Sequence, residues 1–118
     1  MRYMLLIYGD EQVLNESERQ ACYQESAQLA QRLDAAGQFI ATAPLHLTAL
    51  ATSVQVRQGK RLVTDGPFAE TREQLGGYFM VEAANLDEAL AIAEQIPGAK
   101  WGTVEVRPVI ELGELLPE

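Results

Sequence analysis

The sequence predicts one α+β domain built from two βαβ units, with a small hairpin between them. The chain has 118 residues, which is enough for one domain with a core of its own. Short apolar runs of strand length alternate with two longer stretches of helical periodicity. Glycine, proline, asparagine or aspartate separates most of these segments. We therefore treat residues 1–118 as a single domain.

Six segments have the composition of β-strands. They are short and rich in apolar or β-branched residues, and in several of them apolar and polar side chains alternate. Their ranges are 2–8, 38–43, 53–57, 61–64, 78–83 and 103–109. Gln58-Gly59 joins the third strand to the fourth as a two-residue hairpin turn, in which glycine supplies the positive φ that the turn requires.

Two helices lie between these strands. The first ends before Gly37, a residue type that commonly follows a helix end. Asn15 and Ser17 compete as its N-cap, because each is followed three residues later by Glu or Gln. Asn85 caps the second helix, which we expect to end at Pro97-Gly98. The order βαβ, hairpin, βαβ predicts a ferredoxin-like fold with an extra hairpin. An acidic tail, 111–118, docks or frays.

Apolar residues occupy both faces of the predicted sheet. In the first strand, Met4 and Leu6 alternate with Leu5 and Ile7. Two helices can cover only one face of such a sheet, so the other apolar face needs a partner. We expect a second copy, which gives a homodimer whose two sheets form an α/β barrel around a central space. The alternative is a monomer in which one sheet face is partly solvated.

The charge balance excludes several classes of function. The chain has 17 acidic and 9 basic residues, a formal net charge of −8, and no run of Lys or Arg. Such a surface repels phosphate groups, so we expect no nucleic-acid partner and no anionic membrane partner. The apolar run from Met4 to Ile7 is too short for a signal peptide or a membrane span. We therefore expect a cytoplasmic protein.

The residue types also argue against metals and cofactors. Cys22 is the single cysteine and His46 the single histidine, so neither an intrachain disulfide nor a cysteine-based zinc site can form. Cys22 sits in a helical pattern, and we interpret it as a buried thiol rather than a reactive one. Gly76-Gly77 lacks the surrounding motif of a phosphate-binding loop. We expect no cofactor and no metal.

Residues 63–78 read VTDGPFAETREQLGGY. This segment resembles the DGPFAETKE motif of the YCII-related family, with Arg72 where lysine is usual. The opening RYMLLIYGD and the late segment GTVEVRPV also resemble that family, so the likeness spans residues 2 to about 109. The resemblance implies a ferredoxin-like fold, a dimeric α+β barrel and a pocket near the motif's aspartate, Asp65. It implies no particular reaction.

Asp65 and His46 are the candidate catalytic residues. Asp65 follows a strand and precedes Gly66-Pro67, and a carboxylate on such a loop can serve as general base or acid. It can instead organise the turn by bonding the backbone two residues on. His46 is the natural proton shuttle near neutral pH, although a lone loop histidine is more often an ordinary polar residue. The family resemblance implies a pairing of a histidine with the aspartate.

Four further residues are candidates for ligand binding. Arg107 on the last strand can clamp a carboxylate group in bidentate fashion. Glu70 adds a carboxylate within the motif, and Tyr8 and Tyr78 lie near strand ends with a hydroxyl each. Each has a structural alternative: salt bridging for the arginine, a solvated acidic turn for the glutamate, and core packing for the tyrosines.

Two functions from different classes remain open. The first is a dimer that handles an unknown small molecule in a pocket at the DGPF loop, with cofactor-free acid–base chemistry of isomerase or lyase type and Asp65 as base. The second is a non-catalytic ligand-binding or regulatory module. Members of the resembled family often lie near extracytoplasmic-function sigma factors, which implies such a regulatory setting. A purely structural role of the DGPF turn is a third possibility.

Overall fold

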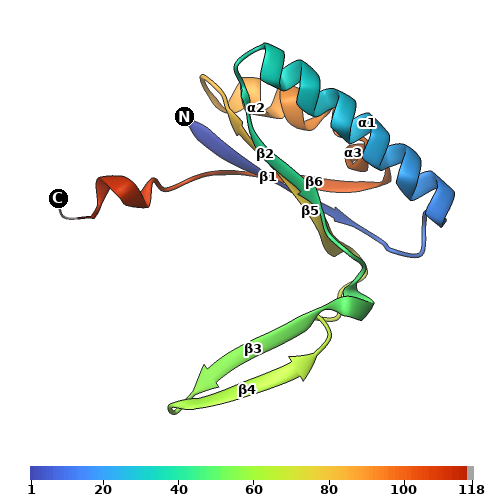
Figure 1. The fold of residues 1–118 in the computed structure, drawn as a ribbon, viewed down its shortest axis with the longest axis vertical. Coiled ribbons are helices and arrows are strands. Elements are labelled where there is room, and N and C mark those ends of the chain that lie inside the picture. The colour runs from blue at the N-terminus through green and yellow to red at the C-terminus, as the bar shows by residue number, and fades with distance from the viewer. Residues whose placement is uncertain (117–118) are drawn as a thin grey trace.

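A computed structural model describes residues 1–116 of the chain (Figure 1), so the last two residues of the predicted tail lie outside it. A four-stranded antiparallel sheet has the order β2-β5-β1-β6, and β3 and β4 form a separate two-stranded sheet. The strands are β1 Arg2–Gly9, β2 Phe39–Pro44, β3 Thr52–Arg57, β4 Lys60–Asp65, β5 Gln74–Glu82 and β6 Gly102–Pro108. The helices are α1 Glu16–Ala35, α2 Leu86–Ala93 and α3 Gly98–Trp101, with 3-10 turns η1 Thr48–Leu50 and η2 Leu112–Glu114.

This arrangement confirms the predicted α+β class and the order of the elements. The two βαβ units flank the hairpin, as expected from the sequence. Within the described residues the main sheet is open: β2 and β6 are its edges, and the sheet does not close into a barrel in one chain. Any barrel therefore requires a second copy.

Side-chain caps explain where the two long helices begin. The Asn15 side chain accepts a hydrogen bond from the Glu18 amide at 2.8 Å, and the Glu18 carboxylate accepts one from the Asn15 amide at 2.9 Å. This reciprocal pair is a capping box, so Asn15 and not Ser17 is the cap of α1. The Asn85 side chain caps α2 by accepting a single hydrogen bond from the Glu88 amide at 2.9 Å. Each cap therefore determines the residue at which its helix begins.

Two boundaries differ from the sequence prediction by more than one residue. β5 begins at Gln74, four residues before the predicted start, because its glycine-containing first half pairs with the end of β1. The second predicted helix is two pieces: α2 ends at Ala93, and Gly98 begins the short helix α3 instead of ending a helix. Glycine lowers strand and helix propensity, so local patterns missed the first half of β5 and the separate helix α3, and they made the second helix too long.

The core lies between the helices and one face of the sheet. Figure 1 shows α1 and α2 on the same side of the sheet. Leu5 and Phe79 from the sheet are fully buried against Leu29 of α1 and Ile92 of α2. Burial of these apolar side chains is the main source of stability, at roughly 1.5–3 kcal/mol for each large one.

The opposite face of the sheet is also apolar. Met4 stands opposite Met80, and Leu6 stands opposite Tyr78, in neighbouring rows of the ladder between β1 and β5. Strand alternation places these four side chains away from the helices, and they are only half-buried. We call them the open face. They confirm the prediction that both faces of the sheet carry apolar residues.

The hairpin, residues 52–65, projects away from the rest of the chain, and we call it the arm. Gln58 and Gly59 both have positive φ, at 52° and 75°, as the predicted two-residue turn requires. Figure 1 shows the arm on the side of the sheet opposite the helices. The radius of gyration is 16.2 Å, whereas a compact chain of this length has about 13.5 Å. The arm and the C-terminal segment account for this extended shape.

Candidate functional site

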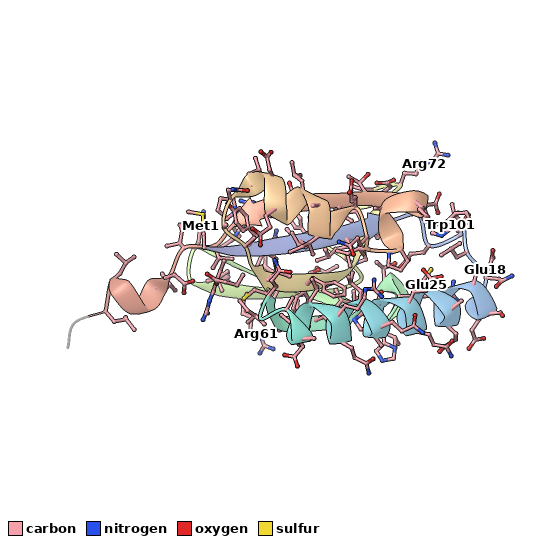
Figure 2. The ribbon with its side chains drawn as sticks, turned by 90° about the horizontal axis from the view of Figure 1, so that it is seen from above. Met1, Glu18, Glu25, Arg61, Arg72 and Trp101 are labelled. Atoms are coloured by element: carbon pink, nitrogen blue, oxygen red, sulfur yellow. The ribbon has the colours of Figure 1, made fainter. Side chains whose placement is uncertain are left out.

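A pocket of about 250 Å³ opens on the helix-covered side of the sheet. Its walls come from α1, from α3, and from the ends of β1 and β2 next to the start of β5. The wall residues are mainly apolar and include Ile7, Leu14, Phe79 and Ile96. Trp101 of α3 is half-exposed and also lines the pocket, and Figure 2 shows it at the same end of the molecule as Glu18 of α1. The pocket therefore combines mainly apolar walls with an aromatic ring that is partly exposed to solvent.

Two glycines bring α3 against the end of β1. A Cβ atom at Gly98 would lie 2.6 Å from Cγ2 of Ile7, and one at Gly102 would overlap the carbonyl oxygen of Tyr8. A larger residue at either position would push the helix away from the strand. This close approach determines the position of Trp101 relative to the rest of the pocket.

The carboxylates of Asp10 and Glu11, in the loop after β1, also line the pocket. Asp10 accepts a hydrogen bond from the Gln12 amide at 2.9 Å and forms an ion pair with Arg72 at 3.7 Å. Arg72 is almost fully exposed, so this pair contributes little to stability. It does show that the second half of the DGPF segment reaches the pocket, where Gln74 and Gly76 are also wall residues.

The polar side chains deeper in the pocket come from α1. Cys22, Tyr23 and Ser26 supply a thiol and two hydroxyl groups. Burial raises the pKa of the Cys22 thiol, and the negative charges of Glu25 and Glu18 raise this pKa further. The thiol therefore stays protonated near neutral pH, where it is a weak nucleophile and a weak hydrogen-bond donor. The sequence identified this cysteine as part of a helix, but not as part of a pocket.

Asp65 lies at the end of β4, exposed, and does not line this pocket. Within residues 1–116 its carboxylate accepts no hydrogen bond, so the predicted turn role of the side chain is wrong. The residue two positions on is Pro67, which has no N–H to donate. The turn is held instead by the Gly66 amide, which donates to the Ala51 carbonyl at 2.7 Å, and by the Ser53 hydroxyl, which donates to the Gly66 carbonyl at 2.8 Å.

His46 lies in the loop after β2 and is exposed. It lines a second, shallower hollow next to the main pocket, together with Glu16 and Tyr23. In the described part of the chain no hydrogen bond or ion pair joins His46 to Asp65, and they line no common pocket. A single chain therefore does not bring the two candidate catalytic residues together.

The remaining candidates lie in three places. Tyr8 is among the residues that line the main pocket. Tyr78 belongs to the open face, and Arg107 stands opposite Met4 in the ladder between β1 and β6, which places it on the same side. Glu70 is exposed in the loop between β4 and β5. The predicted ligand-binding residues therefore lie at the main pocket, on the open side of the sheet and in a loop, and they do not share one site.

The described residues contain neither a candidate metal centre nor a candidate membrane-spanning helix. Among the side chains that the structure describes, no three of His, Cys, Asp or Glu are grouped so that they could hold a metal ion. No helix in the described range is both long and apolar enough to cross a membrane.

Comparison with known proteins agrees with the motif. The profile of the YCII-related domain matches residues 1–113. An uncharacterized protein of Rhizobium meliloti (strain 1021) is 35% identical over 114 residues, and the match covers 92% of each chain. The likeness thus extends over the sheet, the helices, the arm and the DGPF segment together. The chain belongs to the YCII-related family.

Proposed function

We propose that this protein is a homodimer that binds a small, uncharged, mainly apolar molecule in the pocket between α1 and α3. The observation that carries this proposal is the composition of the pocket: about 250 Å³ of space with mainly apolar walls and a few hydroxyl and thiol groups. Ligand sites in proteins typically have this mixture, in which apolar walls give affinity and a few polar groups give orientation.

The chemistry of the walls narrows the class of ligand. Asp10, Glu11 and Arg19 are the charged wall residues, and because the two carboxylates outnumber the one guanidinium group, their net negative charge disfavours an anionic ligand. The volume suits a compound with one aromatic ring and short substituents. A phenol-type ligand fits well, because its ring can pack beside Trp101 while its hydroxyl meets Tyr23 or Ser26.

Binding, and not a reaction, is the function that one chain supports best. Cys22, the one thiol of the pocket, is partly buried, and its raised pKa keeps it protonated near neutral pH. Asp65 and His46 are not joined, and neither lines the main pocket. The pocket therefore has groups that recognise a ligand and no assembled acid–base pair.

The dimer is supported by the open face. Met4, Leu6, Tyr78 and Met80 form a contiguous apolar surface that no helix covers. Such a surface on a sheet is typical of an interface. The strand order β2-β5-β1-β6 agrees with a ferredoxin-like fold, and two such sheets whose open faces are turned toward each other across a central space would form the predicted barrel.

Thermal unfolding in the presence of p-cresol tests the ligand site. A ligand that binds the folded state stabilises it by mass action and therefore raises Tm. The stabilisation is about 2.7 kcal/mol when the ligand concentration is 100 times Kd. We expect p-cresol to raise the Tm of the wild type. Ser26→Phe fills the pocket and abolishes this shift, whereas Gln24→Phe, on the exposed side of α1, keeps it. Equal shifts in all three proteins, or no shift in the wild type, would contradict the proposal.

A second candidate is acid–base catalysis at Asp65 in the assembled dimer. The observation that favours it is the Asp65 carboxylate itself, which is exposed and unused by the turn that it begins. Asp65→Asn preserves the shape of the side chain and removes its charge. We expect this variant to unfold at the wild-type temperature while it loses the response to any substrate that the wild type converts. Early melting with an unchanged response would remove Asp65 from the function.

A further inference from the structure

We propose that the arm is a clasp that embraces a second copy of the chain, with the face formed by Val54, Val56 and Val63 packed on the open face of that copy. This inference rests on the proposed dimer and names the element that completes it. The arm is a part of the chain whose apolar surface is left uncovered by the rest of the same chain.

The arm is a two-stranded sheet that makes no ladder with the main sheet. Val54 stands opposite Val63 in its ladder, and Val56 follows on the same face. Their side chains are 62%, 51% and 63% exposed. An isolated two-stranded hairpin is only marginally stable in water, and three exposed valines on one face make an apolar strip without a cover. The strip therefore requires a partner surface.

The charge of the arm indicates what that partner is. Arg57, Lys60 and Arg61 are three of the nine basic residues of the chain, and no acidic residue lies between positions 52 and 64. All 17 acidic residues lie outside positions 52–64, and Asp65, the last residue of the arm, is the only one of them that belongs to the arm. The basic tip of the arm is thus complementary to the body of another copy. A strongly acidic chain that keeps a basic cluster on its most exposed element has the charge pattern of self-association.

The direction of the arm points to the open face. In Figure 1 the arm leaves the sheet on the side away from the helices, so that sheet and arm form two limbs with the open face between them. A second copy, related by a two-fold axis, presents its own open face toward this space. There the valine strip meets Met4 and Met80 of the other copy. The basic tip approaches Glu105, the one acidic residue of β6, which stands opposite Leu6 on the same side of the sheet as Arg107.

The same geometry gives Asp65 a place in the assembly. Side chains alternate along β4, so Asp65 lies on the same face of the arm as Val63 and Arg61. When this face packs on the second copy, the aspartate is carried to the border of the interface. A site that uses Asp65 would then be complete only in the dimer.

Sedimentation velocity and light scattering over a range of concentrations test the clasp. Three variants are compared with the wild type: Val54→Asp on the valine strip, Gln55→Asp on the opposite face of the same strand, and Met80→Glu on the open face. We expect a dimeric wild type, an at least 100-fold weaker dimer for Val54→Asp, and a wild-type dimer for Gln55→Asp. Met80→Glu gives a monomer.

The outcomes separate the two proposals. If Met80→Glu is monomeric while Val54→Asp dimerises like the wild type, the dimer stands and the clasp is overturned. If the wild type is a monomer at every concentration, both proposals fail. If Gln55→Asp weakens the dimer as much as Val54→Asp, the valine strip is not the contact face, and the inference is wrong in its central point.

Hydrogen exchange of the wild type provides a test that needs no mutation. The amides of β3 and β4 exchange rapidly in a free two-stranded arm and slowly in a covered one. We expect at least tenfold stronger protection of residues 52–65 at concentrations where the dimer is populated than at dilution, while Leu5 and Phe79 in the core change little. Equal exchange of the arm at both concentrations would overturn the clasp.

Discussion

Glu11, in the loop after β1, accepts two hydrogen bonds from Thr48, one from the backbone amide at 2.8 Å and one from the hydroxyl at 2.5 Å. Glu11 lines the pocket, and Thr48 begins the 3-10 turn that leads into the arm. The two residues therefore tie the ligand pocket on the helix side to the root of the element that we assign to dimerisation. The contact therefore links the proposed ligand pocket directly to the proposed dimerisation element.

Removal of the hydroxyl from this contact should loosen the connection. Thr48→Val keeps the shape of the side chain but deletes the donor, and leaves part of the half-buried Glu11 carboxylate without a partner. We expect a loss of about 1 kcal/mol in the free energy of unfolding, measured by urea denaturation. Thr64→Val is the control, because Thr64 is exposed on the arm. Equal losses for the two variants would show that the hydrogen bond is not the cause.

Gly102 should be the least replaceable residue at the pocket. Gly102→Ala places a Cβ atom on the carbonyl oxygen of Tyr8 in the neighbouring strand, so β6 must shift away from β1. We expect a loss of about 2–4 kcal/mol or failure to fold. Gly9→Ala, at the position directly opposite, has nothing within 4 Å of the new Cβ and should cost less than 1 kcal/mol. Thermal unfolding of the pair measures the difference, and similar melting temperatures would refute it.

The capping box of α1 predicts a contrast between two neighbouring polar residues. Asn15→Ala removes the side chain that accepts from the Glu18 amide, which should lower stability by about 1 kcal/mol. Ser17→Ala should be neutral or slightly stabilising, because Ser17 is a helical residue and alanine has the higher helix propensity. Chemical denaturation of both variants decides between them. The reverse order would mean that the helix begins at Ser17.

The raised pKa of Cys22 predicts slow alkylation at neutral pH. The thiolate is the reactive form, so iodoacetamide should modify Cys22 more slowly than glutathione at pH 7, and the rate should still climb above the pH range of an ordinary thiol. Since the folded state holds this proton more tightly than the unfolded chain, the group's contribution to stability is present below the ordinary thiol range and is lost as pH rises through the raised pKa.

Glu25→Gln provides the matched variant for this measurement. It removes one of the two negative charges that raise the pKa and leaves the burial of the thiol unchanged. We expect faster alkylation than in the wild type at the same pH, measured by mass spectrometry. If Cys22 reacts as fast as glutathione in the wild type, burial does not protect the thiol, and the pocket is more open to solvent than we infer.

Local signals in the sequence were sufficient for much of the fold. Asn85 indicated the start of α2, Asn15 and Ser17 narrowed the start of α1 to two residues, and Gln58-Gly59 indicated the turn of the arm, because caps and tight turns depend on residues close together in the chain. The alternation of Met4 and Leu6 with Leu5 and Ile7 indicated two apolar faces. The DGPF segment, through its length, indicated the family.

By itself, then, the sequence determined the α+β class, the order of the elements, the family and the presence of apolar residues on both faces of the sheet. Only the tertiary structure decided which residues share a site. It placed Cys22 and Trp101, distant in sequence, around one pocket, and it placed Asp65 and His46 outside it. The reason is physical: strand and helix patterns depend on neighbours within a few residues, whereas a pocket depends on how α1 and α3 pack over the sheet, and that packing follows from contacts such as Gly98 against Ile7.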